Sequence, residues 1–423
     1  MGQPVRASRH QKVVLVAVVL RGASRASVVE HLDELERLAD TAGGECVARV
    51  MQDRPSPDPA TWIGKGKAEE IKAICAERGA DLVIFDDDLT SAQARNLEKI
   101  IEKTVIDRSG LILDIFVRHA RSREARTQVE LAQLNYMLPR LTRAWTHLER
   151  QAGGIGTRGV GETQLEIDRR LIRHRIAKLK EELQHIEKTR DTQRRGRRDA
   201  YTVALVGYTN AGKSTLFNQL ASGSAHAANQ LFATLDAKLQ KAAFDAPRET
   251  VVIDTVGFIR KLPHHLVASF RSTMEEAASA DLVLHVVDSS HPQFEEQRTV
   301  GNQVLTDLGI EPARVIDVFN KSDLPLGVEE SQLPNGAIRV SGLTGDGLPR
   351  LIEAICEKEF AGGRLVRLDI PSSESRLLAR LYEVARVHRQ TPHDDGVDLL
   401  AWVPEEVAHL FKEFEVGEAG QRS

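Results

Sequence analysis

Short hydrophobic runs alternate with amphipathic stretches over the first 120 residues. The runs have the length and composition of strands, and the stretches between them, such as Val28–Leu38 and Ala68–Cys75, repeat apolar residues at helical spacing. The predicted strands are Val13–Leu20, Cys46–Met51, Leu82–Phe85 and Val105–Ile106. Strands that alternate with helices favour a largely parallel sheet with helices packed on it.

The pattern changes after residue 120 to two apolar stripes whose members are spaced alternately four and three residues apart. The first consists of Leu134, Leu138, Leu141, Trp145 and Leu148, and the second of Ile172, Ile176, Leu179, Leu183 and Ile186. This spacing is typical of two helices that pack as a coiled-coil hairpin. Pro139 is expected to kink or break the first helix, and the second is expected over about Leu165–Lys188. Five glycines among the nine residues Gly153–Gly161 predict a loop at the tip of this arm.

From residue 200 onward, strand-like runs again alternate with helical patterns over the length of one domain. The expected strands are Thr202–Val206, Val251–Ile253, Leu282–Val287 and Val315–Phe319. The final segment is shorter, with strands expected at Leu365–Ile370 and Val397–Val403 and a helix at Glu374–Val387.

The first strand of this third block leads into a phosphate-loop motif. Residues 207–214 read Gly-Tyr-Thr-Asn-Ala-Gly-Lys-Ser and match the pattern G-x-x-x-x-G-K-[ST] between a strand and a helix. In such a loop the backbone N–H groups surround the phosphates, while Lys213 supplies positive charge and Ser214 a hydroxyl for Mg²⁺. The motif predicts a nucleotide-binding domain.

Three further motifs follow later strands of the same block. Asp254-Thr255-Val256-Gly257 offers a carboxylate for a Mg²⁺-bound water and a glycine N–H for the γ-phosphate. Asn320-Lys321-Ser322-Asp323 places a carboxylate where it accepts two hydrogen bonds from guanine, and adenine has neither of those donors. Ser341-Gly342-Leu343 can direct a backbone N–H to the guanine O6. The predicted ligand is therefore GTP or GDP.

Three single residues bear on hydrolysis. Thr234, which lies between Ser214 and Asp254, is the candidate to bind Mg²⁺ and the γ-phosphate, although it can also be an ordinary surface threonine. Asn210 can either help to coordinate a monovalent cation such as K⁺ or cap a turn. Phe258 stands after Gly257, where many GTPases have a polar side chain that orients the attacking water. Slow unaided hydrolysis is expected.

The net charge of −4 conceals an uneven distribution. Residues 118–199 contain 20 Lys/Arg and 11 Asp/Glu, a balance of +9, which leaves −13 for the rest of the chain. A basic segment in an acidic protein favours an anionic partner such as nucleic acid, and the alternative is an arginine-rich helix face in water. Residues 64–67 (Gly-Lys-Gly-Lys) and the basic run Arg194–Arg198 likewise fit either phosphate contacts or an ordinary turn and linker.

Composition narrows the remaining possibilities. Hydrophobic residues make up 41% and charged residues 28%, which fits packed domains, and the longest apolar run has eight residues where a membrane-spanning helix needs about 20. The three cysteines have no metal-binding spacing. A cytoplasmic protein is expected. The predicted fold class is α/β, with an N-terminal α/β domain (1–120), a helical coiled-coil arm with a glycine-rich tip loop (121–199), a Ras-like P-loop GTPase domain (200–365) and a small C-terminal α+β domain (366–423).

Several segments together resemble the HflX family of ribosome-associated GTPases. They are the loop Gly153–Glu166, with Val160 where proline is usual, the turn Gly64–Lys67, the segment Gln128–Leu141, and Phe232–Asp236 followed by Asp254–Phe258. The resemblance implies a GTPase that binds the large (50S) ribosomal subunit, with its arm directed towards the peptidyl-transferase centre. It also implies a role in dissociating stalled or idle 70S ribosomes, often under stress.

These arguments give a defined set of expected residues. GTP binding is assigned to Gly207, Tyr208, Thr209, Asn210, Ala211, Gly212, Lys213, Ser214, Thr215, Phe232, Ala233, Thr234, Leu235, Asp236, Asp254, Thr255, Val256, Gly257, Asn320, Lys321, Ser322, Asp323, Ser341, Gly342 and Leu343. Catalysis is assigned to Lys213, Thr234, Gly257 and Asn210. Mg²⁺ is assigned to Ser214 and Thr234 directly and to Asp254 through water. RNA contacts are assigned to Arg158, Gly154, Gly156, Gly159 and Gly161.

The expected partners are GTP or GDP, the large ribosomal subunit and its rRNA, and the protein is expected to be a monomer. Three other functions stay open at this point: a switch whose coiled coil docks a protein partner, a GTPase of tRNA modification or small-subunit assembly, and an RNA-remodelling ATPase that uses residues 1–120. The positive arm favours RNA over a protein partner.

Overall fold

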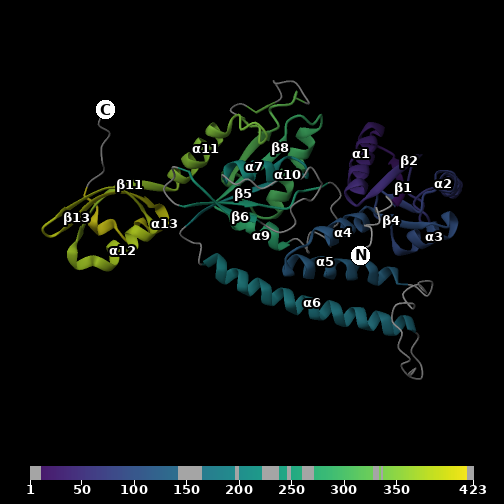
Figure 1. Cartoon of the computed structure of the whole chain (residues 1–423), viewed down its shortest axis with the longest axis horizontal. Coiled ribbons are helices and arrows are strands. Elements are labelled where there is room, and N and C mark those ends of the chain that lie inside the picture. Colours follow the sequence, from purple (N-terminus) through teal and green to yellow (C-terminus); the bar gives the residue numbers. More distant parts are fainter. Residues whose placement is uncertain are drawn as a thin grey trace, which may run out of the picture. The chain divides into compact units, whose positions relative to one another are not determined.

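A computed structural model describes residues 11–141, 164–195, 200–221, 238–244, 249–259, 271–326, 333–334 and 337–416. Among these, the residues up to Glu187 form one compact unit and those from Lys188 onward form a second. Figure 1 identifies the elements of both units.

The first unit is built on a four-stranded parallel sheet in the order β2-β1-β3-β4. Its strands are β1 (Gln11–Leu20), β2 (Gly44–Arg54), β3 (Leu82–Phe85) and β4 (Thr104–Asp107). Every residue of Val13–Val19 in β1 is buried. A continuous apolar run rather than an alternating one is typical of a strand covered on both faces, which is the position of β1 inside this sheet.

Helices cover both faces of this sheet. They are α1 (Arg25–Thr41), α2 (Lys65–Arg78), α3 (Ser91–Ile101) and α4 (Arg108–His119). Alternate β1 residues Val14, Val16 and Val18 form one core with buried residues of α2 and α3. The opposite face of β1 lies against α1, which also contacts α4. The predicted N-terminal α/β fold is confirmed.

Two antiparallel helices follow, α5 (Arg123–Met137) and α6 (Gln164–Arg195), with a short 3₁₀ turn η1 (Leu138–Arg140) at the end of α5. The predicted break at Pro139 is confirmed, since the α-helix stops at Met137. Arg175 of α6 makes two hydrogen bonds to Glu130 of α5, at 2.6 and 2.7 Å. Trp145, Leu148 and the glycine-rich tip lie outside the described residues.

Helix α6 is longer than the sequence predicted. The stripe suggested an end near Lys188, but the helix continues to Arg195 and includes the start of the basic run that had suggested a linker. A helix can continue by its backbone hydrogen bonds without further apolar residues, so the stripe could not mark its end.

The second unit contains a six-stranded sheet in the order β10-β9-β8-β5-β7-β6. Its strands are β5 (Tyr201–Gly207), β6 (Lys238–Ala242), β7 (Thr250–Asp254), β8 (Leu282–Asp288), β9 (Val315–Asn320) and β10 (Ile338–Arg339). All neighbours are parallel except β6, which pairs antiparallel with β7 at one edge. The central strands β5 and β8 are almost wholly buried.

Helices again flank both faces of the sheet. They are α7 (Lys213–Leu220), α9 (Arg271–Ser279), α10 (Phe294–Asp307) and α11 (Leu348–Ala361), with a 3₁₀ turn η3 (Pro312–Arg314) before β9. Residues of α7 and α11 share one core with β5, β7 and β8, whereas Phe294 of α10 packs edge-on against Phe319 in a separate cluster. This is the predicted P-loop GTPase fold.

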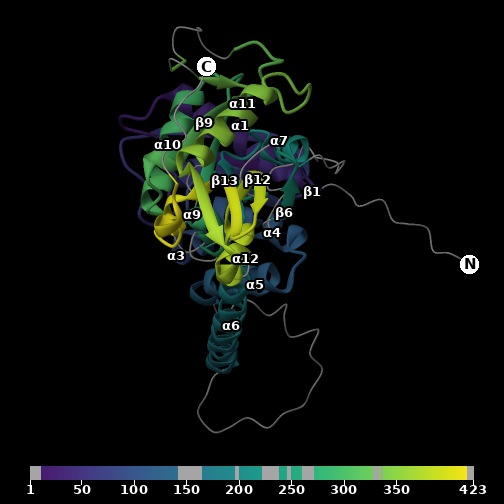
Figure 2. The same cartoon turned by 90° about the vertical axis from the view of Figure 1, so that its left-hand side faces the viewer.

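The last segment forms a three-stranded antiparallel sheet, β11-β13-β12, shown in Figure 2. Its elements are β11 (Gly363–Pro371), η5 (Ser372–Glu374), α12 (Ser375–Val384), β12 (Arg386–His393), β13 (Gly396–Pro404), α13 (Glu405–Ala408) and η6 (Lys412–Phe414). The helix predicted to extend to Val387 ends at Val384. Residues from Arg386 onward pair with β13 instead, and backbone pairing decides the conformation of this mostly exposed strand.

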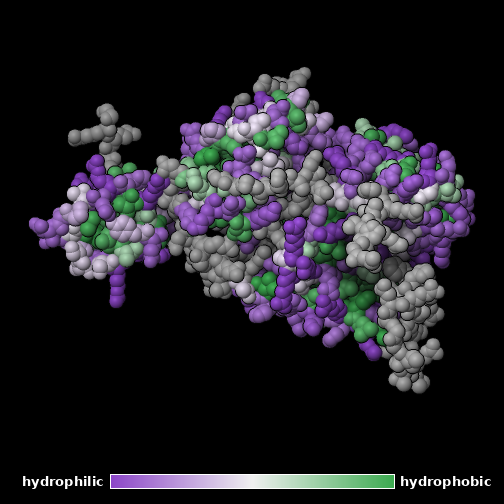
Figure 3. All heavy atoms as spheres, viewed as in Figure 1, coloured by the Kyte–Doolittle hydropathy of each residue, from purple (hydrophilic) through white to green (hydrophobic). Residues whose placement is uncertain are grey.

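Hydrophilic residues cover most of the face drawn in Figure 3, with hydrophobic residues in small groups between them. Within the described part of the chain, none of the helices is both long enough and apolar enough to span a bilayer.

Candidate GTP-binding site

The predicted nucleotide motifs meet at one edge of the second unit's sheet. The phosphate loop follows β5, Asp254 ends β7, Asn320 ends β9, and Ser341 lies just beyond β10. These strands are parallel, so their carboxyl ends share an edge. Ligands of open α/β sheets bind at this edge, where neighbouring connections diverge.

The glycines of the phosphate loop are required by close backbone approaches. Gly207 has φ +146°, and a Cβ there would lie 2.1 Å from the carbonyl oxygen of Val286. Gly212 has φ +89°, and a Cβ would lie 2.2 Å from the side-chain nitrogen of Asn320. At Gly257, after β7, a Cβ would lie 2.8 Å from the Cα of Thr209. The loop can therefore hold its shape only with glycine at these positions.

Lys213 is buried at the centre of the loop. Its ammonium group donates hydrogen bonds to the carbonyl oxygens of Gly207 at 3.0 Å and Tyr208 at 2.8 Å. Burial lowers the pKa of this ammonium to about 8, and the charge of Asp254 offsets part of the effect. A positive charge is thus held within the turn where the phosphates of a nucleotide are expected.

This lowered pKa predicts that nucleotide affinity falls as the pH rises through about 8. Bound phosphates stabilise the charged lysine, so binding takes up a proton above that pH, and the affinity decreases by up to about tenfold per pH unit. Fluorescence titration with an N-methylanthraniloyl-labelled GDP between pH 7 and pH 9 measures the effect. Lys213→Arg should give a flat profile, because arginine stays charged throughout. A wild-type affinity that is constant up to pH 9 would contradict the assignment.

Ser214 and Asp254 form the part of the site suited to a metal ion. The Ser214 hydroxyl donates to the Asp254 carboxylate at 2.7 Å, and Asp254 is fully buried. A hydroxyl beside a buried carboxylate supplies the oxygen donors that Mg²⁺ prefers. The donor set fits Mg²⁺, which would be held by the Ser214 hydroxyl and, through water, by Asp254.

The expected base-binding residues are brought together from two strands. Asn320 donates to the carbonyl oxygen of Ala211 at 2.8 Å and accepts a hydrogen bond from the N–H of Gly342 at 2.9 Å. Ser341 donates to one carboxylate oxygen of Asp323 at 2.6 Å. Asn320 therefore connects the phosphate loop to the segment at Gly342 that is expected to bind the guanine base. Ser341 fixes the orientation of Asp323. The Gly342 N–H, one candidate for guanine O6, is engaged by Asn320.

Two further residues support this site and were not found from the sequence. Asp288, at the end of β8, forms a 2.6 Å ion pair with Lys321, and Ser289 donates its hydroxyl to the carbonyl oxygen of Asn320 at 2.7 Å. Their position directly after a buried strand was the available signal. Lys321 itself has φ +64°, and these contacts hold it there.

Phe258 is buried and held by the backbone. Its N–H donates to Gly207 at 2.9 Å, and its carbonyl oxygen accepts from Thr209 at 2.6 Å. The residue as a whole is 2% exposed. It is thus part of the support of the phosphate loop. Asn210 is exposed and has φ +64°, a conformation that asparagine tolerates better than most residues.

The other expected residues divide into two groups. Thr215 lies in α7, Thr255 is buried with its hydroxyl bonded to Leu205, and Leu343 is 75% exposed. Phe232, Ala233, Thr234, Leu235 and Asp236 lie outside the described residues, as do Arg158 and the tip glycines.

Three family models match this chain. One described as "GTP-binding GTPase N-terminal" matches residues 29–117, one described as "GTP-binding GTPase Middle Region" matches 119–197, and one described as "50S ribosome-binding GTPase" matches 202–321. The three matches follow one another along most of the chain.

Similar proteins share the sequence over most of its length. GTPase HflX of Escherichia coli K12 is 44% identical over 376 residues, which is 87% of this chain and 88% of that protein. GTPase HflX of Caldanaerobacter subterraneus is 43% identical over 96% of this chain and 94% of its own length. Among solved structures, a GTP-binding protein from Sulfolobus solfataricus in complex with GDP has a TM-score of 0.44, 23% sequence identity, and coverage of 83% of this chain and 99% of its own.

The level and extent of identity to these relatives, together with a complete phosphate loop at the sheet edge, establish the class of protein. The chain belongs to the HflX family of GTPases, enzymes that hydrolyse GTP to GDP and phosphate.

Proposed function

We propose that this GTPase binds the large ribosomal subunit and, depending on its nucleotide state, dissociates stalled or idle ribosomes. The observation that carries the proposal is the match of the nucleotide-binding domain to a family described as 50S ribosome-binding GTPases. HflX proteins from several bacteria match the rest of the chain as well, so the whole architecture belongs with this domain.

The exposed face of α6 supports a polyanionic partner. Ile176 and Leu179 of this helix are buried, whereas several cationic residues around them are exposed. They are Arg170, Arg173, Lys178 and Lys180, with His174 between them, and no acidic residue occurs from Arg169 to Lys180. A cluster of exposed cationic side chains along a helix suits the phosphate backbone of rRNA. The tip residues Arg158, Gly154, Gly156, Gly159 and Gly161 are proposed to enter the subunit.

Within the nucleotide site, this chain's residues have separate roles. Lys213 is proposed to hold the β- and γ-phosphates, and the Gly257 N–H to bind the γ-phosphate. Mg²⁺, held by Ser214, Thr234 and a water on Asp254, would neutralise phosphate charge when bound. K⁺ near Asn210 is proposed to add to the rate. Asp323 and the backbone near Leu343 are proposed to select guanine.

Co-sedimentation with isolated subunits tests the proposal. The protein is expected to pellet with large subunits when a non-hydrolysable GTP analogue is bound, and much less with GDP or with small subunits. Binding should weaken steeply as the salt concentration rises, because lysine and arginine contacts to phosphate release counterions. Failure to pellet with large subunits at low salt in either nucleotide state would refute it. Co-sedimentation with small subunits alone would instead favour a role in small-subunit assembly.

Hydrolysis is expected to be slow in the isolated protein and strongly stimulated by large subunits. Phe258 is buried and apolar, so it cannot orient the attacking water, and a partner must complete the site. Partner-supplied groups accelerate other GTPases by about 10³–10⁵. Phosphate release measured with and without large subunits checks this, with small subunits as the control. An intrinsic rate that is already fast and that ribosomes leave unchanged would contradict the prediction.

A further inference from the structure

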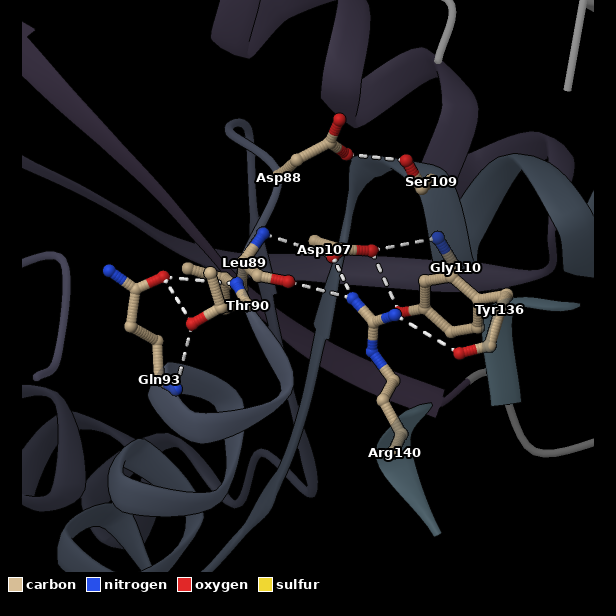
Figure 4. Close-up of polar contacts among 9 residues, drawn as sticks. All are labelled: Asp88, Leu89, Thr90, Gln93, Asp107, Ser109, Gly110, Tyr136 and Arg140. Carbon is tan, nitrogen blue, oxygen red and sulfur yellow. Dashed lines mark hydrogen bonds and ion pairs between the residues drawn. The ribbon is translucent and has the colours of Figure 1, made fainter. Parts of the chain in front are cut away.

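Asp107 lies at the point where the arm meets the first unit's sheet. It is the last residue of β4, its side chain is 1% exposed, and it accepts hydrogen bonds from four different parts of the chain (Figure 4). One carboxylate oxygen accepts from the N–H of Gly110 at 2.9 Å and from the Tyr136 hydroxyl at 2.8 Å. The other accepts from the N–H of Leu89 at 3.1 Å and from Arg140 at 2.7 Å.

Four donors match the roughly four lone-pair sites of a carboxylate, so Asp107 is saturated. The donors come from the β3–α3 loop, the first turn of α4, the end of α5, and the turn η1. We call Asp107, Leu89, Gly110, Tyr136 and Arg140 the Asp107 joint. A buried carboxylate that satisfies four separate donors holds their backbone segments in one arrangement.

Arg140 secures the arm side of the joint. The same terminal nitrogen that binds Asp107 also donates to the carbonyl oxygen of Leu89 at 2.8 Å, and the guanidinium lies 3.6 Å from the centre of the Tyr136 ring. Its other terminal nitrogen donates to the carbonyl oxygen of Tyr136 at 3.1 Å. The fork geometry of arginine allows these contacts at once, and lysine could not make them all. The turn at Pro139 brings Arg140 back towards the sheet.

The contact is also shaped by Gly110. A Cβ on this residue would lie 2.7 Å from the Tyr136 hydroxyl oxygen, so only glycine lets the tyrosine reach Asp107. Gly110 is helical and has no positive φ, so its backbone does not require glycine. Close approach of the arm is therefore the reason that the structure gives for this glycine.

The joint is connected onward to the second arm helix. Leu141, the residue after Arg140, is buried, and its carbonyl oxygen accepts a hydrogen bond from Arg169 of α6 at 3.0 Å. Arg175 and Glu130 then clamp α6 to α5 further along. A continuous set of polar contacts thus leads from the sheet, through Asp107 and Arg140, to α6.

We propose that Asp107 and Arg140 are positioning residues that fix the arm to the sheet domain. The arm and the sheet domain then act together as one rigid lever on the ribosome. The lever part of this proposal rests on the proposed function. The rigidity part concerns the protein alone and can be tested without ribosomes.

A distance measurement between the two parts tests rigidity. Spin labels are attached to genetically encoded non-canonical amino acids that replace the exposed residues Glu77 of α2 and Glu181 of α6. This labelling does not react with the three native cysteines. We expect a narrow distance distribution in the full-length protein and at least a twofold broader one in Arg140→Met. Lys103→Met is the matched control, since it removes a cation from a surface pair with Asp81 next to the same strand. An unbroadened distribution in Arg140→Met would show that the Asp107 joint does not hold the arm rigidly on the sheet domain.

Gly110→Ala provides a second variant that keeps every donor and should not weaken α4, because alanine is the better helix former. It should broaden the distribution by displacing the Tyr136 hydroxyl. Tyr136→Phe should broaden the distance distribution less in the Gly110→Ala variant than in the wild-type chain. Gly110→Ala already removes the contact between the Tyr136 hydroxyl and Asp107, so little is left for the second change to remove. Equal effects in both backgrounds would show that Gly110 does not act through the tyrosine.

Ribosome dissociation tests the lever. Arg140→Met should pellet with large subunits within about threefold of wild type and keep its unstimulated GTP hydrolysis, but dissociate ribosomes at least tenfold more slowly. A broadened distance distribution together with a wild-type dissociation rate would show that dissociation does not need a rigid arm. The role of the Asp107 joint in holding the arm would still stand. If wild-type protein neither binds nor dissociates ribosomes, the proposed function fails, whereas the distance measurement still decides the joint.

Discussion

Asp323→Asn is expected to convert this enzyme from a guanine-specific to a xanthine-preferring nucleotide hydrolase. The Asp323 carboxylate has only acceptors, which suit the N1–H and 2-amino group of guanine. Xanthine carries a 2-oxo group that requires a donor, and the asparagine amide supplies one. Guanine then faces an amide N–H where it needs an acceptor, and the affinity for GDP should fall by about 10² or more, since mismatched polar groups in a closed site are costly.

The structure explains why the change should be confined to base selection. Ser341 donates to one Asp323 oxygen at 2.6 Å, and asparagine retains an oxygen that can accept this bond. The phosphate loop is held by Asn320 and Phe258 and does not depend on Asp323. Competition of GDP and XDP against a fluorescent guanine nucleotide measures the shift. Ser341→Ala is the control, because it should weaken guanine binding without creating affinity for xanthine. A variant with wild-type affinity for GDP and none for XDP would show that Asp323 does not read the base.

Shortening residues 153–161 to a tight turn is expected to abolish ribosome dissociation while leaving nucleotide binding intact. Arg158 and the surrounding glycines are proposed to enter the large subunit, whereas the described contacts between the arm helices lie outside this segment, at Arg175–Glu130 and Arg123–Glu182. The phosphate loop and the motifs at Asp254, Asn320 and Ser341 follow residue 200 and belong to the second unit. The hairpin and the GTP site should therefore survive.

Light scattering of 70S ribosomes in the presence of GTP measures dissociation directly. We expect the loss of at least nine-tenths of the wild-type rate in the shortened protein, with unchanged GDP affinity and unchanged unfolding temperature. Arg158→Ala alone should give a smaller loss. Dissociation at the wild-type rate would show that the working surface lies elsewhere, and the cationic face of α6 would then be the next candidate.

Asp323 is described together with its neighbours, so the base-selection test rests on geometry as well as on sequence. The tip lies outside the described residues, so its role is drawn from its composition and from the resemblance to HflX proteins. The Asp107 joint holds the described base of the arm.

The local pattern of the sequence was sufficient for most of the fold. Val13–Leu20, which is apolar throughout, and Leu282–Val287, which is apolar except for His285, have the pattern of strands covered on both faces. Both lie inside sheets flanked by helices. The phosphate loop was readable because its chemistry is contained in eight consecutive residues. The break at Pro139 followed from the missing N–H of proline. In each case the determining interactions are close along the chain.

Strand β12 and the end of α6 were missed for the opposite reason. Arg386–His393 has little apolar pattern, and only pairing with β13 makes it a strand. Helix α6 continues past its apolar stripe to Arg195, because backbone hydrogen bonds can extend a helix without further apolar residues. The functional neighbours Asp288 and Ser289 gave no motif, because they act through Lys321 and Asn320, which are more than 30 residues away.

The sequence by itself determined that this chain is a P-loop GTPase. The phosphate loop, the motif at Asp254 and the guanine motif at Asp323 can each be recognised from a few consecutive residues. Only the tertiary structure decided that Asn320 joins the base side to Ala211, 109 residues earlier, and that Asp107 gathers donors from positions 18, 29 and 33 residues away. A buried polar group must find partners wherever the fold places them, and the fold, not the spacing along the chain, sets which groups meet.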